Sequence, residues 1–76
     1  MFTTHIGNAW DGAIVQFPAS ARYFMKVCNA KDGTGGVVDI VKGQYIPTRD
    51  LDDYKLGTQV CIIAMNLEDF ITDKED

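Results

Sequence analysis

The residues best equipped for chemistry in this 76-residue chain are carboxylates, and they gather in its last third. Asp50, Asp52 and Asp53 stand close together after Pro47, and Glu68 and Asp69 follow the most apolar run. Oxygen clusters of this kind can hold Ca²⁺ or Mg²⁺, but the glycine and the terminal glutamate of an EF-hand loop are missing. We therefore expect a solvated acidic segment, with no metal site and no cofactor.

The histidine and the cysteines form no recognisable catalytic or metal-binding motif. His5 is the only histidine, and no neighbour in the sequence would orient it as an acid–base catalyst. Cys28 and Cys61 lie inside apolar runs, without another cysteine or a histidine at metal-ligand spacing. We expect two buried thiols in a reducing compartment, and a Cys28–Cys61 bridge if their strands are neighbours. The sequence predicts that the protein is not an enzyme.

Charge is distributed unevenly along the chain, whose formal net charge is −4. Residues 1–49 carry five basic and three acidic residues, whereas residues 50–76 carry two basic and eight acidic ones. An acidic last third would repel phosphate backbones and anionic lipid, and it would attract a basic partner. We therefore expect direct nucleic-acid binding to be disfavoured.

The predicted interaction surface combines these acids with apolar anchors. Its members are Asp50, Asp52, Asp53, Tyr54, Glu68, Asp69, Trp10 and Phe70. We expect this surface to dock on a basic surface of a larger protein, either as a binding module or as an inhibitor that mimics the charge of nucleic acid. For Trp10, the more common place in a core competes with the role of an exposed anchor.

The alternative function is a small barrel that binds nucleic acid directly. Basic side chains would then have to line up with aromatic rings, on which the bases stack. The candidates are Arg22, Lys26, Lys31 and Lys42, with Tyr23, Phe24 or Tyr45 for stacking.

The element around which the rest must pack is the apolar run within residues 58–66. It is short, rich in β-branched residues and free of charge, which favours a central strand buried on both faces over a helix. Side chains alternate along a strand, so two sets should point to opposite faces of the sheet. These sets are Val60, Ile62 and Ala64 on one face, and Cys61, Ile63 and Met65 on the other.

The segments before this run predict further strands. Residues 13–17 fit a strand that ends at Pro18. Residues 21–30 fit either a helix or a strand, and we favour a strand because Tyr, Phe, Val and Cys prefer pleated surfaces and a glycine-rich turn at 31–36 leads into Val37–Val41. The glycine spacing matches no phosphate-binding loop.

The later segments predict short helical pieces. Thr48 could cap a turn or short helix that ends before Gly57. Asn66 could cap a C-terminal helix with Leu67, Phe70 and Ile71 on one side; a final edge strand at 70–72 is the competing interpretation. Residues 73–76 should be mobile.

Together these elements predict one mainly β domain over residues 1–76, a small twisted antiparallel sheet or partly open barrel with one or two short helical turns. The alternative is an α+β fold with a helix at about 20–30. No stretch approaches the roughly 20 apolar residues of a membrane span, and the start lacks a signal-peptide pattern, so we expect a cytoplasmic protein. Exposed sheet edges make a homodimer possible.

Overall fold

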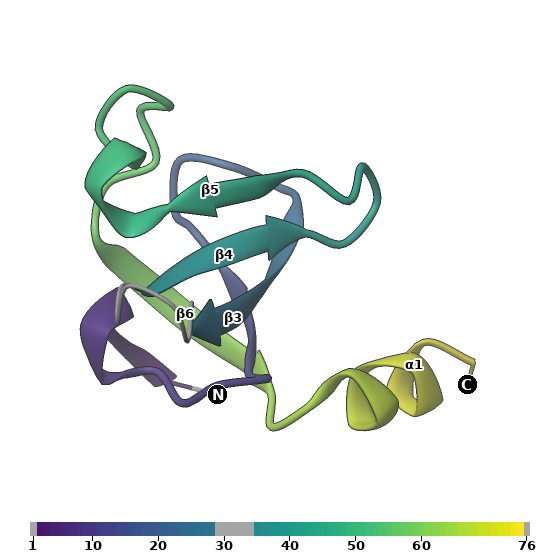
Figure 1. Ribbon diagram of the computed structural model, residues 1–76. Coiled ribbons are helices and arrows are strands. Elements are labelled where there is room, and N and C mark those ends of the chain that lie inside the picture. Colours follow the sequence, from purple (N-terminus) through teal and green to yellow (C-terminus); the bar gives the residue numbers. More distant parts are fainter. Residues whose placement is uncertain (1, 29–34, 76) are drawn as a thin grey trace.

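The computed structural model describes residues 2–28 and 35–75, and in them the chain folds into one six-stranded antiparallel sheet (Figure 1). The strands are β1 (Phe2–His5), β2 (Ile14–Gln16), β3 (Tyr23–Cys28), β4 (Gly35–Asp39), β5 (Tyr45–Pro47) and β6 (Gln59–Ala64). They are ordered β1-β6-β2-β3-β4-β5. The helical pieces are the 3₁₀ turns η1 (Ile6–Asn8) and η2 (Thr48–Asp50) and the helix α1 (Leu67–Glu75). The predicted mainly β fold is confirmed.

Strands β2 to β5 follow one another as neighbours, which confirms the strand interpretation of residues 21–30 and contradicts the alternative helix. β3 pairs with β4 from Phe24 opposite Asp39 to Cys28 opposite Gly35. The predicted turn at 31–36 is wrong for its last two residues, because Gly35 and Gly36 belong to β4; residues 31–34 lie outside the described part of the chain. Val41, predicted as strand, follows β4 in an exposed turn.

β6 lies between β1 and β2 and is second from an edge of the sheet. The side chains of Val60 and Ile62 enter the core as predicted, whereas Ile63 is only half-buried and Met65 is exposed. Burial on both faces is therefore wrong for this strand. The reason is that no second layer covers the whole outer face, since α1 is the only regular helix longer than one 3₁₀ turn among the described residues.

The core lies on one face of the curved sheet. Phe17 and Phe24 are fully buried and meet edge to face, with ring centroids 5.4 Å apart. The connection from β5 to β6, residues 48–58, closes this core by inserting Leu51 and Leu56. The core cluster consists of Ile6, Ala9, Ala13, Val15, Phe17, Phe24, Val37, Ile46, Leu51, Leu56, Val60 and Ile62.

The helix α1 packs on the opposite face of the sheet. Asn66 caps it as predicted, because its Oδ1 accepts a hydrogen bond from the Asp69 N–H at 2.8 Å. Phe70 stacks against Tyr23 of β3 with ring centroids 4.8 Å apart. The competing edge strand at 70–72 is therefore wrong. The helix continues through Glu75, and Asp76 lies outside the described residues.

The turn after β5 begins differently from the prediction. Thr48 is not a helix cap: Pro47 stands at that position, and the Thr48 hydroxyl donates to the Gly35 carbonyl oxygen at 2.8 Å. The Thr48 side chain therefore ties η2 to β4. The segment ends near the predicted Gly57, whose φ of +77° favours glycine.

Replacing Gly36 with alanine should destabilise the sheet. An added Cβ would lie 2.6 Å from Cε1 of Tyr45 and 2.7 Å from the Ile46 carbonyl oxygen, and the second of these atoms is backbone that cannot rotate away. Overpacking of this kind costs about 1–3 kcal/mol, to be measured as the change in unfolding free energy in urea. Gly35→Ala is the control, because its nearest neighbour is the flexible Lys26 side chain. Equal losses in the two variants would contradict the steric explanation.

Candidate functional site

An exposed aromatic cluster lies where β1, the loop after η1 and the end of β6 meet. Trp10 is 40% exposed and its indole Nε1 donates to the Met65 carbonyl oxygen at 2.8 Å. The Phe2 ring lies 6.4 Å from the Trp10 ring, centroid to centroid. Phe2 is 54% and Met65 66% exposed. We call Phe2, Trp10 and Met65 the tryptophan patch.

The tryptophan patch is held in place by the fold. Phe2 pairs with Ile62 in the β1–β6 register, so its position on the sheet is set by backbone pairing. The hydrogen bond to Met65 ties the indole to the chain that leaves β6, and it satisfies the only polar atom of that side chain. The interpretation of Trp10 as a core residue is therefore wrong. Its ring is presented to the surface by a rigid scaffold.

Two of the predicted acidic residues closely follow the tryptophan patch along the chain. Glu68 and Asp69 are exposed in the first turn of α1, three and four residues after Met65. The positive end of the helix dipole stabilises carboxylates at this position. The chain that leaves the patch at Met65 therefore carries two exposed carboxylates in its next turn.

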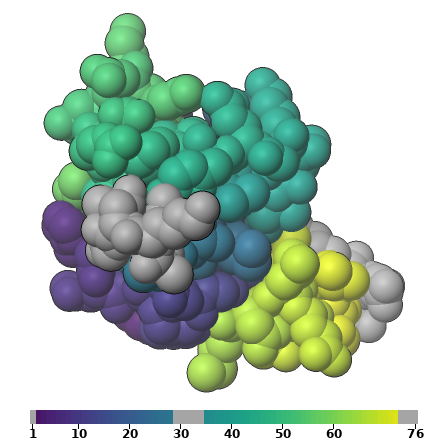
Figure 2. Space-filling view, in the orientation of Figure 1, coloured from purple at the N-terminus to yellow at the C-terminus, as the bar shows by residue number. Residues whose placement is uncertain are grey.

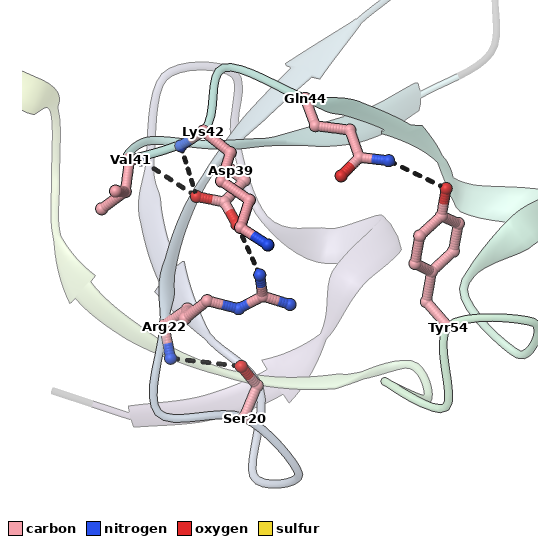
Figure 3. Close-up of polar contacts among 7 residues, drawn as sticks. All are labelled: Ser20, Arg22, Asp39, Val41, Lys42, Gln44 and Tyr54. Carbon is pink, nitrogen blue, oxygen red and sulfur yellow. Dashed lines mark hydrogen bonds and ion pairs between the residues drawn. The ribbon is translucent and has the colours of Figure 1, made fainter.

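The other predicted acids lie at a different end of the molecule. Asp50, Asp52, Asp53 and Tyr54 belong to the connection between β5 and β6, which Figures 1 and 2 show at the end opposite α1. Asp52 and Asp53 are exposed and Asp50 is half-buried. The Tyr54 hydroxyl accepts a hydrogen bond from Gln44 Nε2 at 3.0 Å (Figure 3). The structure thus separates the predicted surface into two groups.

Phe70, predicted as an anchor for a partner, is half-buried against Tyr23. Its contact attaches α1 to the sheet. The helix residues that are more open to a partner are Leu67 and Ile71, one turn apart on the same side of α1.

An ion pair with a buried carboxylate connects the residue before β3 to the end of β4. Asp39 is 1% exposed and its Oδ2 lies 3.1 Å from Nη1 of Arg22, whose side chain is 46% exposed (Figure 3). Oδ1 accepts hydrogen bonds from the backbone N–H groups of Val41 and Lys42 at 2.9 and 3.0 Å. The sequence signal for this site is a single aspartate inside an otherwise apolar run, and our sequence interpretation missed it.

Lys26 is also buried, against expectation. Its Nζ lies 3.4 Å from the Ile6 carbonyl oxygen and 3.5 Å from that of Ala9. Lys26 shares a face of β3 with the core residue Phe24, so the strand alternation places it inside. Two of the basic residues proposed for nucleic-acid binding are thus engaged within the protein. Lys26 donates to backbone carbonyl groups of η1 and the loop after it, and Arg22 pairs with Asp39. Lys42 is exposed, and Lys31 lies outside the described residues.

The cysteines are less buried than predicted: Cys28 is exposed, Cys61 is half-buried, and both are free thiols. Cys61 borders an open hollow of about 470 Å³ beside the loop after β2. The hollow is lined by Gln16, Phe17, Pro18, Ala19, Ser20, Ala21 and Cys61. None of these residues is an acid or a histidine that could serve as a base for the thiol.

Within residues 2–28 and 35–75, no group of three or more His, Cys, Asp or Glu side chains is placed to hold a metal ion. In the same ranges, no helix combines the length and the apolar character needed to cross a bilayer.

Comparison with known proteins returned no match: no family model fits the chain, and no curated protein or solved structure is similar to it.

Proposed function

We propose that this chain is a non-enzymatic protein-binding module that presents the tryptophan patch to a basic surface of a larger protein. The observation that carries the proposal is that Phe2, Trp10 and Met65 are all exposed, with the Phe2 and Trp10 rings 6.4 Å apart and the indole hydrogen-bonded to the Met65 backbone. Tryptophan and methionine are enriched in protein interfaces, and buried tryptophans are frequent hot spots. Fixing the indole before binding reduces the entropy that an interface has to offset.

The charge of the surroundings supports a basic partner. Glu68 and Asp69 follow Met65 of the patch by three and four residues, and most of the acidic residues of the chain belong to its last third. Carboxylates at the border of an interface increase the rate of association with a positively charged surface. This arrangement also suits an inhibitor that docks where a nucleic acid would otherwise bind. Because the two acidic groups lie at opposite ends of the molecule, only one of them can face such a binding site.

The alternative of direct nucleic-acid binding has less support. Proteins that bind single-stranded nucleic acid by stacking its bases on aromatic rings also place unpaired Lys and Arg side chains along the path of the phosphate backbone. Here the Lys26 amine lies inside the protein and the Arg22 guanidinium pairs with Asp39. We place the module in the cytoplasm, because the free thiols of Cys28 and Cys61 suit a reducing compartment.

Replacing Trp10 with alanine should abolish most of the binding. Truncating a hot-spot tryptophan costs about 2 kcal/mol or more, which is a loss of affinity of about 30-fold. The partner would first be captured from the source cell by affinity purification and identified by mass spectrometry, and its affinity would then be measured by titration calorimetry. Tyr54→Ala is the control, since Tyr54 is an equally exposed aromatic residue of the other group. Full affinity of Trp10→Ala with loss in Tyr54→Ala would move the site to the 48–58 connection.

A charge test separates the two acidic groups without altering the aromatic residues. Glu68→Gln with Asp69→Asn should slow association and reduce its dependence on salt. Asp52→Asn with Asp53→Asn removes the same charge from the far end and should leave association nearly unchanged. The reverse result would contradict the assignment of Glu68 and Asp69 to the same interface as the tryptophan patch.

A further inference from the structure

β1 and β5 are the two edge strands of the sheet, and only β5 is protected against a further strand. Both edge strands run directly into a 3₁₀ turn, but β5 is one residue shorter than β1 and ends at Pro47. Short strands and prolines are means by which native sheets avoid pairing with another chain. The β1 sequence Phe-Thr-Thr-His contains no proline, lysine or carboxylate, and three of its four residues are exposed. Among the described residues no strand pairs with its outer edge.

The hydrogen-bonding pattern identifies the groups on this outer edge. In an antiparallel pair, residues alternate between those bonded to the neighbouring strand and those whose N–H and C=O point away from it. The Ile6 N–H donates to the Thr58 carbonyl oxygen at 2.7 Å, directly after the paired residues of β1 and β6. Because bonded residues recur at every second position, Thr4 and Phe2, two and four residues before Ile6, also bond to β6. Thr3 therefore directs its N–H and C=O groups to the outer edge. His5 directs its N–H there as well, and its carbonyl oxygen, on the same side, also accepts the first hydrogen bond of η1.

We propose that β1 of one copy pairs antiparallel with β1 of a second copy, in a register centred on Thr4. Only residues with outward-pointing groups can bond across the new edge. Placing Thr3 of one copy opposite His5 of the other satisfies this condition twice, around a two-fold axis between the two Thr4 residues. The contact forms four N–H···O bonds, two of them to the second lone pair of a His5 carbonyl oxygen, and joins the sheets of both copies into one. It also sets Thr4 beside Thr4, a favourable cross-strand pair.

Charge also permits this pairing with a second acidic copy. No carboxylate lies on β1, so like charges do not face each other across the axis. α1 follows the end of β6 that pairs with Phe2. In the register centred on Thr4, the two Phe2 residues lie four residues, or about 13 Å, apart along the strands. The acidic helices thus start at opposite ends of the joined strands, further apart than the Debye length of about 8 Å. This self-complementarity favours a second copy over a basic segment of another protein.

Sedimentation equilibrium of the full chain tests the association. Over about 10 µM to 1 mM, the range expected for a small interface, the mass should rise from 8.4 kDa towards twice that value. Thr3→Pro removes the outward N–H and should weaken association at least tenfold, because two of the four hydrogen bonds are lost. Thr3→Val keeps this N–H and should associate like the original chain. Circular dichroism checks the fold of each variant.

Cross-linking tests the register. In a background with Cys28→Ser and Cys61→Ser, Thr4→Cys should oxidise to a covalent dimer, because facing Cα atoms at a non-hydrogen-bonded pair are about 4.5 Å apart, within the range of disulfides. Thr3→Cys should cross-link poorly, since its opposite residue is His5.

A constant mass of 8.4 kDa over the whole range of protein concentration overturns the proposal. So does equal association of Thr3→Pro, or faster cross-linking of Thr3→Cys. Association that appears only on adding a lysine-rich peptide would identify the other occupant of this edge.

Discussion

Replacing Phe24 with alanine is expected to remove about 3–5 kcal/mol from the free energy of unfolding. Phe24 is fully buried on the core face of β3, and its ring packs edge to face on Phe17. The sheet cannot collapse into the cavity, because the backbone at this position is paired on both sides, with Val15 of β2 and Asp39 of β4. A domain of 76 residues has about 4–11 kcal/mol of stability in total, so this variant should be close to unfolded at physiological temperature.

The measurement is a urea titration followed by far-ultraviolet circular dichroism. Phe2→Ala is the matched control, because it makes the same substitution at an exposed aromatic residue on an edge strand and should cost less than about 1 kcal/mol. Comparable losses in both variants would show that the core is not centred on the Phe17–Phe24 contact. Phe2→Ala has a second use, since it should weaken partner binding while leaving the fold intact.

Replacing Asp39 with alanine is expected to cost about 2–4 kcal/mol, because two backbone donors lose a charged acceptor and the guanidinium of Arg22 loses its partner. Asp39 sits at the end of β4, and its Oδ1 accepts from Val41 and Lys42 in the turn that leads to β5. In the variant, the half-exposed guanidinium of Arg22 can be hydrated by water. The loss of unfolding free energy should therefore stay below the highest values found when a fully buried ion pair is broken.

Asp39→Asn separates the two contributions of this side chain. An amide oxygen can still accept the two turn hydrogen bonds, whereas the charge opposite Arg22 is gone. Asp39→Asn should therefore lose less stability than Asp39→Ala, measured by thermal unfolding at neutral pH. Equal losses would show that the turn hydrogen bonds contribute nothing and that the ion pair accounts for the whole effect.

Much of the fold was predictable because the signals are local. The β-branched and aromatic residues of 13–17 and 23–28 and the Asn66 cap each act on their own segment. Such signals depend on neighbours two to four residues away, and they identify strands, turns and helix starts. The excess of acidic residues in the last third was equally visible in the sequence.

The candidate site was not predictable in the same way. Trp10 could belong to the core or to the surface, and only the approach of the β6 end, 55 residues later, holds its indole at the surface. Lys26 and Asp39 enter the interior because Phe24, on the same face of the sheet, faces the core. The two acidic groups separate because β6 runs between them, with the 48–58 connection before its start and α1 after its end (Figure 1).

The amino-acid sequence was therefore sufficient to predict the mainly β class, most of the strands, the capped C-terminal helix and the acidic balance of the last third. Which side chains share a surface became visible in the folded chain alone: the tryptophan patch, the buried Asp39 and Lys26, and the open edge of β1. The physical reason is that strand formation depends on nearby residues, whereas the order of strands in the sheet, and with it the face and the edge that each residue joins, depends on contacts between distant parts of the chain.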